Sequence, residues 1–265
     1  RPRNALIRST HGKACGPIEV LKTLSQVGRM ITQGGKRDGA HMAVMSVYHP
    51  DIEEFIGCKS DGEEQFSNFN ISVGVDSNFM RAVEEDLRIH LTWPMCDEIH
   101  TKESAILCQD ANSGNFPKAR DLFSKIIHGA WANGEPGMIW FDRMEKDNVT
   151  PHLASIQACN PCGEQPLLPN ESCNLGSINL GHMIDFSSQI PKFNEERFRK
   201  SIQYAVHFLD NVVDINNHPT EATQDFNGRT RKIGLGVMGW ADLLVRMHIP
   251  YDSMEALVLA TKVGA

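Results

Sequence analysis

Short strand-like segments alternate with longer helix-like segments along this chain. In the strand-like segments apolar residues recur at every second position, and residues 68–75 are the clearest example. In the helix-like segments they recur every three or four positions, and residues 195–215 form the longest example. Strands that alternate with helices are typical of parallel sheets covered by helices. The sequence therefore predicts the α/β fold class.

The same periodicities predict the individual elements. Pro17 suits the first position of a helix, and the Gly34-Gly35 pair is expected to end it. Asp76 or Ser77 is expected to cap another helix. The other expected strands are 42–47, 137–142 and 233–237, and the other expected helices begin at Pro50 or cover 119–132 and 241–247. Residues 88–115 and 150–180 have no clear period.

Composition limits the possible partners and the compartment. The chain of 265 residues carries 26 Lys and Arg against 33 Asp and Glu, a net charge of −7, which argues against a nucleic-acid binder. No apolar run approaches the ~18 residues that span a bilayer, so no membrane is expected. Seven cysteines without an export signal indicate reduced thiols and a cytoplasmic protein. Because the chain does not begin with Met, we expect a piece of a longer protein.

A glycine-rich segment, Gly234-Leu-Gly236-Val-Met-Gly239, has the spacing of a dinucleotide-binding loop. That function requires a full strand before the first glycine and an acidic residue about 20 positions later. Here Arg229-Thr-Arg-Lys232 precedes the segment and the chain ends too soon. Close packing of a strand on a helix is the favoured interpretation.

A second motif, Cys159-Asn-Pro-Cys162, has the C-x-x-C spacing of redox dithiols. Those dithiols lie at the start of a helix, where the dipole lowers a thiol pKa, but the prolines between residues 161 and 169 disfavour a helix here. Structural zinc would need Cys173 and a fourth ligand at a regular spacing, which the sequence lacks. Both hypotheses are disfavoured, and no metal site is predicted.

The wider segment 160–179 brings three reactive residue types together. In an extended chain alternate side chains point to the same side, so Asn160, Cys162 and Glu164 would face one substrate with an amide, a thiol and a carboxylate. The alternative is an ordinary proline-rich surface loop. Ordered loops on rigid scaffolds often carry active sites, and the pattern alone leaves both interpretations open.

The segment NPCGEQPL at 160–167, followed by ESCNLGSINL at 171–180, resembles the active-site loop of the large, catalytic chain of ribonucleotide reductases. The sequence of this segment is most similar to that of the adenosylcobalamin-dependent class. The resemblance continues, in order, through 34–37 (GGKR), 49–56 (HPDIEEFI), 68–73 (NFNISV), 137–143 (GMIWFDR) and 232–239 (KIGLGVMG).

The resemblance implies a fold and a division of the chain. The family fold is a ten-stranded α/β barrel made of two parallel five-stranded halves, with a finger loop through its centre. Residues 1–265 would be a partial catalytic barrel domain without the N- and C-terminal parts of the full protein. Residues 7–39 would be the specificity-loop region and residues 157–180 the finger loop, with Cys162 hidden at the centre.

The resemblance also implies catalytic roles. Cys162 would become a thiyl radical that abstracts the 3′-hydrogen of the ribose, and Glu164 would be the general base for the 3′-hydroxyl. Asn160 and Gly163 would bind the substrate. Cys173 would be one of two cysteines that supply the electrons. Its partner would lie before residue 1, and candidates within the chain rest on composition alone: Cys15, Cys58, Cys96 and Cys108.

Two further segments resemble loops that sense an effector nucleotide. The first contains Ser9 and Thr10. The second contains Gly34 and Gly35, which permit backbone rearrangement, followed by two cations that suit a nucleotide, Lys36 and Arg37. The alternative for the second segment is a solvated basic end of a helix.

The implied activity is that of an oxidoreductase, a ribonucleoside-diphosphate reductase that is inactive as this fragment alone. The residues themselves leave open whether the substrate is a diphosphate or a triphosphate. The expected cofactor is adenosylcobalamin. The expected partners are a ribonucleotide substrate, a deoxynucleotide or ATP effector, a thioredoxin-type reductant and, at full length, a second copy in a homodimer. The alternatives are a class I-type chain that depends on a separate metal-bearing subunit, and a non-catalytic nucleotide-binding fragment.

Overall fold

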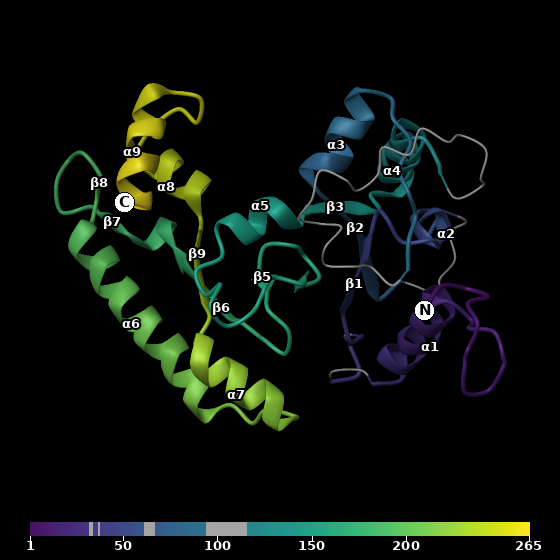
Figure 1. Cartoon of the computed structure of the whole chain (residues 1–265). Helices are drawn as coiled ribbons and strands as arrows, with labels where there is room; N and C mark the ends of the chain where they lie inside the picture. Colours follow the sequence, from purple (N-terminus) through teal and green to yellow (C-terminus); the bar gives the residue numbers. More distant parts are fainter. Residues whose placement is uncertain (32–33, 37, 61–66, 94–115) are drawn as a thin grey trace. The chain divides into compact units, whose positions relative to one another are not determined.

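The computed structural model describes two compact units, Arg1–Pro169 and Asn170–Ala265 (Figure 1). The described residues are 1–31, 34–36, 38–60, 67–93 and 116–265. Each unit has its own parallel strands and its own apolar core. This arrangement confirms the α/β fold class that the sequence predicts.

The first unit is built on a three-stranded parallel sheet in the order β1-β2-β3. The strands are β1 (His41–Ser46), β2 (Phe69–Val75) and β3 (Gly137–Trp140). The first two confirm the predicted strands. The third is shorter than expected because α5 (Phe141–Lys146) begins directly after Trp140.

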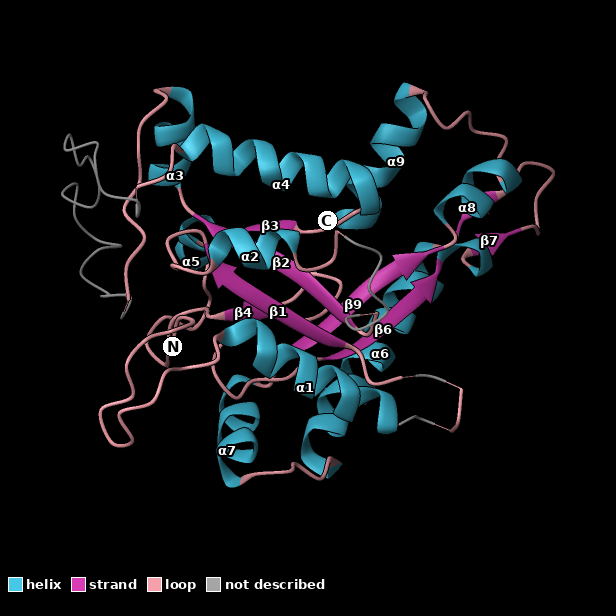
Figure 2. Ribbon diagram, turned by 90° about the vertical axis from the view of Figure 1, so that its right-hand side faces the viewer, coloured by secondary structure: helices cyan, strands magenta, loops and turns pink. Residues whose placement is uncertain are grey.

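Helices cover one face of this sheet. They are α1 (Pro17–Met30), α2 (Ile52–Gly57), α3 (Ser77–Glu84) and α4 (Ala119–Asn133), drawn in cyan in Figure 2. Alternate residues of β2, such as Ile71 and Val73, are 2% and 0% exposed and share one core with Phe55, Phe79 and Leu122 from these helices. Figure 1 shows α5 and the short hairpin of β4 (Ala158–Cys159) and β5 (Pro166–Leu167) on the other side of the strands.

The ends of two helices differ from expectation. α1 ends at Met30, before the Gly34-Gly35 pair, because the chain turns back so that Gly39 N–H donates to the carbonyl of Gly28 over 3.3 Å. On α4, helical spacing places Leu122 and Trp131 on one apolar face; Leu122 is buried, but Trp131 is 80% exposed. The spacing of apolar residues therefore located both helices, but not every residue of the apolar face of α4 is buried.

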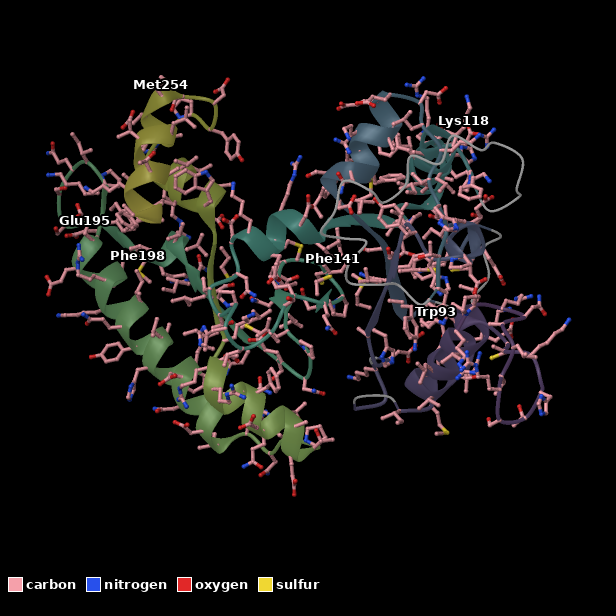
Figure 3. All side chains as sticks on the ribbon, viewed as in Figure 1. Trp93, Lys118, Phe141, Glu195, Phe198 and Met254 are labelled. Atoms are coloured by element: carbon pink, nitrogen blue, oxygen red, sulfur yellow. The ribbon has the colours of Figure 1, made fainter. Side chains whose placement is uncertain are left out.

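The second unit is built on two parallel strands, β6 (Asn174–Asn179) and β9 (Ile233–Met238). The long helix α6 (Glu195–Ile215) packs against both and has the bounds that the sequence predicts. Figure 3 labels its first residue, Glu195, and Phe198 one turn later. The remaining elements are η3 (Leu180–His182), β7 (Ile184–Asp185), β8 (Lys192–Phe193), α7 (Glu221–Thr230), α8 (Trp240–Arg246) and α9 (Met254–Gly264).

The glycine-rich segment forms β9 and the turn into α8. Gly239 has a positive φ of 71°, and a Cβ atom there would lie 2.3 Å from Asn179 Oδ1. A side chain at this position is therefore excluded by the neighbouring strand end. This close approach supports the packing interpretation of the glycines over dinucleotide binding.

Within the described residues, β1–β3 form an open sheet and β6 and β9 an open pair, so no barrel closes here. The described residues therefore contain parallel strands in two separate open groups and not the closed barrel that the resemblance implies. Among the helices of the described segments, none has both the length and the apolar composition needed to cross a bilayer.

Candidate active-site turn

The motif NPCGEQ lies in a tight turn between β4 and β5. The strands pair antiparallel, with Ala158 opposite Leu167 and Cys159 opposite Pro166. Gly163 N–H donates to the carbonyl of Asn160 over 2.9 Å, and Gly163 has a φ of 85°, in the region that glycine tolerates best. The sequence therefore folds these six residues, 160–165, into a compact loop, which we call the cysteine turn.

Asn160 closes the cysteine turn with its side chain. Its Oδ1 accepts a hydrogen bond from Gln165 N–H over 2.9 Å, and its own N–H donates to the carbonyl of Gln165 over 3.3 Å. The expectation that Asn160, Cys162 and Glu164 share one side of an extended segment is therefore wrong in its geometry. The segment is a turn, and the amide oxygen of Asn160 is already engaged within it.

Cys162, Gly163 and Glu164 are exposed. The expectation that Cys162 is hidden at the centre of a closed barrel is not met in this chain. The physical reason is that the parallel strands of the described residues form open sheets, which leave the tip of the hairpin uncovered. A thiol and a carboxylate are thus exposed two residues apart on a hydrogen-bonded turn.

Cys159 behaves differently from Cys162. It is 5% exposed, and burial raises the pKa of its thiol, with the negative charge of Glu164 adding to the effect. A buried thiol held in its neutral form is a poor nucleophile. The Cys159–Cys162 pair also lies on a hairpin and not at the start of a helix, so the context that a thioredoxin-like dithiol needs is absent. Among the described residues, no cluster of three or more His, Cys, Asp or Glu side chains is arranged to hold a metal ion.

A residue that the sequence did not indicate contacts the cysteine turn. The Asn70 side chain, on β2, donates from Nδ2 to the carbonyl oxygen of Pro161 over 2.6 Å. Asn70 occupies the face of β2 opposite to the core-facing residues Phe69 and Ile71. The available signal was a polar residue among the alternating apolar residues of the strand. Its partner lies 91 positions away, so the contact cannot be predicted from the local sequence pattern.

Cys173 lies outside the turn, at the start of the second unit, and is half-buried. Its thiol donates to the carbonyl of Asn174 over 3.4 Å. The flanking residues are firmly held. The carboxylate of Glu171, whose side chain is fully buried, lies 2.7 Å from Lys232 Nζ, and the N–H and hydroxyl of Ser172 both donate to Asn227 Oδ1 over 2.8 Å.

The other candidate cysteines differ in access. Cys15 is exposed, whereas Cys58 is half-buried and burial raises the pKa of its thiol to about 11. The remaining two, Cys96 and Cys108, lie outside the described residues. No described cysteine is therefore singled out as the partner of Cys173.

The two nucleotide-sensing segments lie in the first unit. Ser9 and Thr10 are exposed in a loop closed by an antiparallel bridge between Leu6 and Lys13. The second segment also has exposed described residues, Gly34, Gly35 and Lys36, and both glycines have positive φ, 59° and 69°. Arg37 lies outside the described residues. Both segments are accessible to a ligand, and no described contact ties them to the cysteine turn.

A match to one protein family covers the whole chain. The family described as "Ribonucleotide reductase, barrel domain" matches residues 1–265. The sequence motifs, which run in order from residue 34 to residue 239, all lie within this range.

Individual relatives match over nearly the same range. A vitamin B12-dependent ribonucleoside-diphosphate reductase of Thermoplasma acidophilum is 41% identical over 264 residues, 99% of this chain and 32% of that protein. A protein of the same name from Mycobacterium tuberculosis is 40% identical over 262 residues, 99% of this chain and 35% of that protein. A ribonucleoside-diphosphate reductase subunit alpha of Chlamydia muridarum is 30% identical over 281 residues, covering 98% of this chain and 26% of that protein. The chain thus spans about a third of the length of the first two relatives.

Proposed function

Because this chain belongs to the ribonucleotide reductase family, as a match to its barrel domain, we propose that the full-length protein reduces ribonucleotides to deoxyribonucleotides for DNA synthesis. The observation that carries the proposal is the cysteine turn, which holds Asn160, Cys162 and Glu164 in a chain that matches the family from end to end. The names of the relatives support a ribonucleoside diphosphate as the substrate. The reaction class is that of an oxidoreductase.

The proposed chemistry assigns one role to each side chain of the turn. The sulfur of Cys162, as a thiyl radical, takes the 3′-hydrogen of the ribose and returns it at the end of the cycle. The carboxylate of Glu164 accepts the 3′-hydroxyl proton, which helps the 2′-hydroxyl to leave as water. The amide of Asn160 positions the sugar through its nitrogen, since its oxygen holds the turn closed, and the exposed backbone of Gly163 lets the substrate approach.

The electrons come from a pair of thiols, of which we propose that Cys173 is one. Overall, one ribonucleotide and two thiols give one deoxyribonucleotide, one disulfide and one water, so two electrons move from sulfur to the sugar. A thioredoxin-type reductant then restores the dithiol. The firm anchoring of residues 171–174 suits a thiol that must return to the same position after each cycle.

The proposed cofactor is adenosylcobalamin, which when bound would supply the radical that Cys162 requires. The relatives named as vitamin B12-dependent support it. In this chain the thiol of Cys162 is exposed, so no described side chain covers the sulfur that the cofactor would have to reach. Within the described segments no side chain is assigned to cofactor binding.

A separate radical-generating subunit is the second candidate for the radical source. The Chlamydia muridarum relative named as subunit alpha favours it, although its identity of 30% is lower than the 41% and 40% of the two vitamin B12-dependent relatives described above. Purified full-length protein given only adenosylcobalamin, a ribonucleoside diphosphate and a dithiol distinguishes the two. Deoxynucleotide formation under these conditions supports cobalamin, and strict dependence on an added metal-bearing subunit supports the alternative.

The proposal also includes regulation by an effector nucleotide and the assembly of the full-length protein. Ser9 and Thr10 in the first specificity loop, together with residues 34–37 in the second, would respond to a deoxynucleotide or ATP effector. The exposed positions of both loops are compatible with a ligand. We also propose a homodimer at full length and a cytoplasmic location, with neither nucleic acid nor membrane as a partner.

Replacing Cys162 tests the catalytic assignment. In the full-length protein, Cys162→Ser is expected to abolish deoxynucleotide formation because serine cannot form a thiyl radical, while effector binding measured by calorimetry stays unchanged. Cys173→Ser is expected to form no deoxynucleotide with a thioredoxin-type reductant, because each cycle oxidises two thiols and this variant lacks one of the pair. Sustained turnover by either variant would overturn the role given to that cysteine. Effector binding by wild-type protein without any turnover in the presence of either radical source would favour the non-catalytic alternative.

A further inference from the structure

The face of β2 opposite to the core carries small and polar residues. Phe69, Ile71 and Val73 point into the core of the first unit, whereas Asn70 and Gly74 alternate with them on the other face. A Cβ atom on Gly74 would lie 2.5 Å from the ring of Phe141, the first residue of α5, which Figure 3 labels. The face is therefore covered by α5 near the end of the strand, and near its start Asn70 contacts the cysteine turn.

The contact of Asn70 acts on the peptide that joins Pro161 to Cys162. Each residue has two freely rotating backbone dihedrals, φ and ψ, because the peptide bond itself is planar. The ring of Pro161 fixes its φ near −65°. The hydrogen bond of 2.6 Å from Asn70 Nδ2 holds the carbonyl oxygen of Pro161, and the position of that oxygen is set by ψ. Both dihedrals before Cys162 are thus restrained.

The backbone after Cys162 is restrained as well. Gly163 N–H donates to the carbonyl of Asn160 over 2.9 Å, and Gln165 N–H donates to Asn160 Oδ1 over 2.9 Å. These bonds close the turn on itself but do not fix it to the sheet. The Asn70 contact links the turn to a strand of the rigid sheet, at the residue directly before Cys162.

We propose that Asn70 is a positioning residue that orients the thiol of Cys162 through the Pro161 carbonyl. The proposal rests on the proposed function, since it concerns the aim of the radical-forming sulfur. Only a donor satisfies the contact, because a carbonyl oxygen accepts hydrogen bonds. An aspartate of the same shape would place a carboxylate oxygen against the carbonyl oxygen and release the turn. Asn70 is exposed, so its loss opens no cavity in the core.

The test uses Asn70→Asp in the full-length protein. A small misplacement of a reacting group lowers the rate of chemistry, so we expect kcat to fall about 10- to 100-fold with KM little changed. Hydrogen exchange of the amides of residues 162–165 should become faster in the same variant without substrate. Asn70→Gln keeps an amide donor and is expected to recover part of the lost kcat.

The matched control is Asn78→Asp on α3, which makes the same chemical change in the same unit. Asn78 Oδ1 accepts from Arg81 over 3.4 Å, a contact that aspartate retains. This variant is expected to keep the wild-type kcat and the wild-type exchange of residues 162–165. Its melting temperature also provides the reference for the global stability of Asn70→Asp.

Three results would overturn the role of Asn70. The first is an Asn70→Asp protein with wild-type kcat and wild-type exchange of the turn. The second is a loss of kcat that only follows a lowered melting temperature, with unchanged exchange in the turn. The third is an equal loss in Asn70→Gln and Asn70→Asp. An inactive wild-type protein would instead overturn the proposed function, and the role of Asn70 with it.

Discussion

His49, three residues after the end of β1, shows how one buried side chain couples stability to pH. The residue is 6% exposed, and its Nδ1 accepts a hydrogen bond from Asp51 N–H over 3.0 Å, which requires that this nitrogen carry no proton. Burial lowers the pKa of the imidazole, and the nearby Asp51 carboxylate only partly opposes this. The folded protein therefore prefers the neutral ring.

The sign of the pH dependence follows from this preference. Between the lowered folded pKa and the unfolded value of about 6.5, the unfolded chain binds more protons, so stability rises with pH. The contribution of His49 is complete above about pH 6.5 and is lost as the pH falls toward the folded pKa. We expect His49→Asn, which keeps an acceptor, to reduce the fall in melting temperature of the full-length protein between pH 7.5 and about 5.5. His152→Asn, at an exposed position, is the control, and an unchanged pH dependence in His49→Asn would contradict the assignment.

At the scale of elements, α3 is held by a carboxylate at its start. Asp76 Oδ1 accepts from Phe79 N–H and from the Tyr48 hydroxyl, each over 2.8 Å. Burial, and then the charge of Asp76, raise the pKa of Tyr48, so the hydroxyl keeps its proton and donates. The cap therefore links the start of α3 to the residues that follow β1.

We expect Asp76→Ala to loosen α3 locally. A lost cap of this kind costs about 1 kcal/mol, and the buried Tyr48 hydroxyl loses its acceptor as well. Hydrogen exchange of the amides of residues 77–84 in the full-length protein should become about tenfold faster or more, since ~1.4 kcal/mol corresponds to a factor of ten. Tyr48→Phe separates the two effects because it removes the hydroxyl and keeps the cap. Wild-type exchange rates in Asp76→Ala would show that the carboxylate does not stabilise the helix.

Some elements could be predicted from sequence because their signals are local. Helix α6 has apolar residues at helical spacing over many turns and a cap at Asn194, which accepts from Arg197 N–H. Helix α7 was not predicted because its sequence, EATQDFNGRT, has few apolar residues and so no helical apolar pattern. In the structure, Asn227 is the residue of α7 that is buried. Its start is marked by the reciprocal hydrogen bonds of Thr220 and Thr223, a signal that apolar spacing does not include.

The same limit explains what could be predicted of the candidate site. The motif around Cys162 is contiguous, so sequence located the turn and its reactive residue types. The shape of the turn was not predicted, because it depends on Asn160 bonding to Gln165 rather than facing outward. The contact of Asn70 with Pro161 was not predicted either, because it joins two segments that meet only when the first unit folds.

At the scale of the whole molecule, the parallel strands of the second unit carry exposed apolar side chains. Parallel sheets are commonly covered on both faces, yet Leu175 on β6 and Val237 and Met238 on β9 are 55%, 52% and 54% exposed. The first two relatives are about three times as long as this chain, since it covers 32% and 35% of them. We infer that the remaining part of the full-length protein covers these strands and completes the barrel.

The completed barrel would also shield the cysteine turn, which leads to a direct test. A thiyl radical must be protected from water and stray reductants, so we expect the exposed Cys162 of this chain to become inaccessible at full length. Iodoacetamide should alkylate Cys162 at least about tenfold more slowly in the full-length protein than in the chain of residues 1–265, because thiol reactivity depends on access. Mass spectrometry of the peptides measures both rates, with exposed Cys15 as the reference and circular dichroism confirming that the shorter chain is folded. Equal rates at Cys162 would mean that the turn stays open in the complete molecule, and the thiol would then lack the protection that radical chemistry requires.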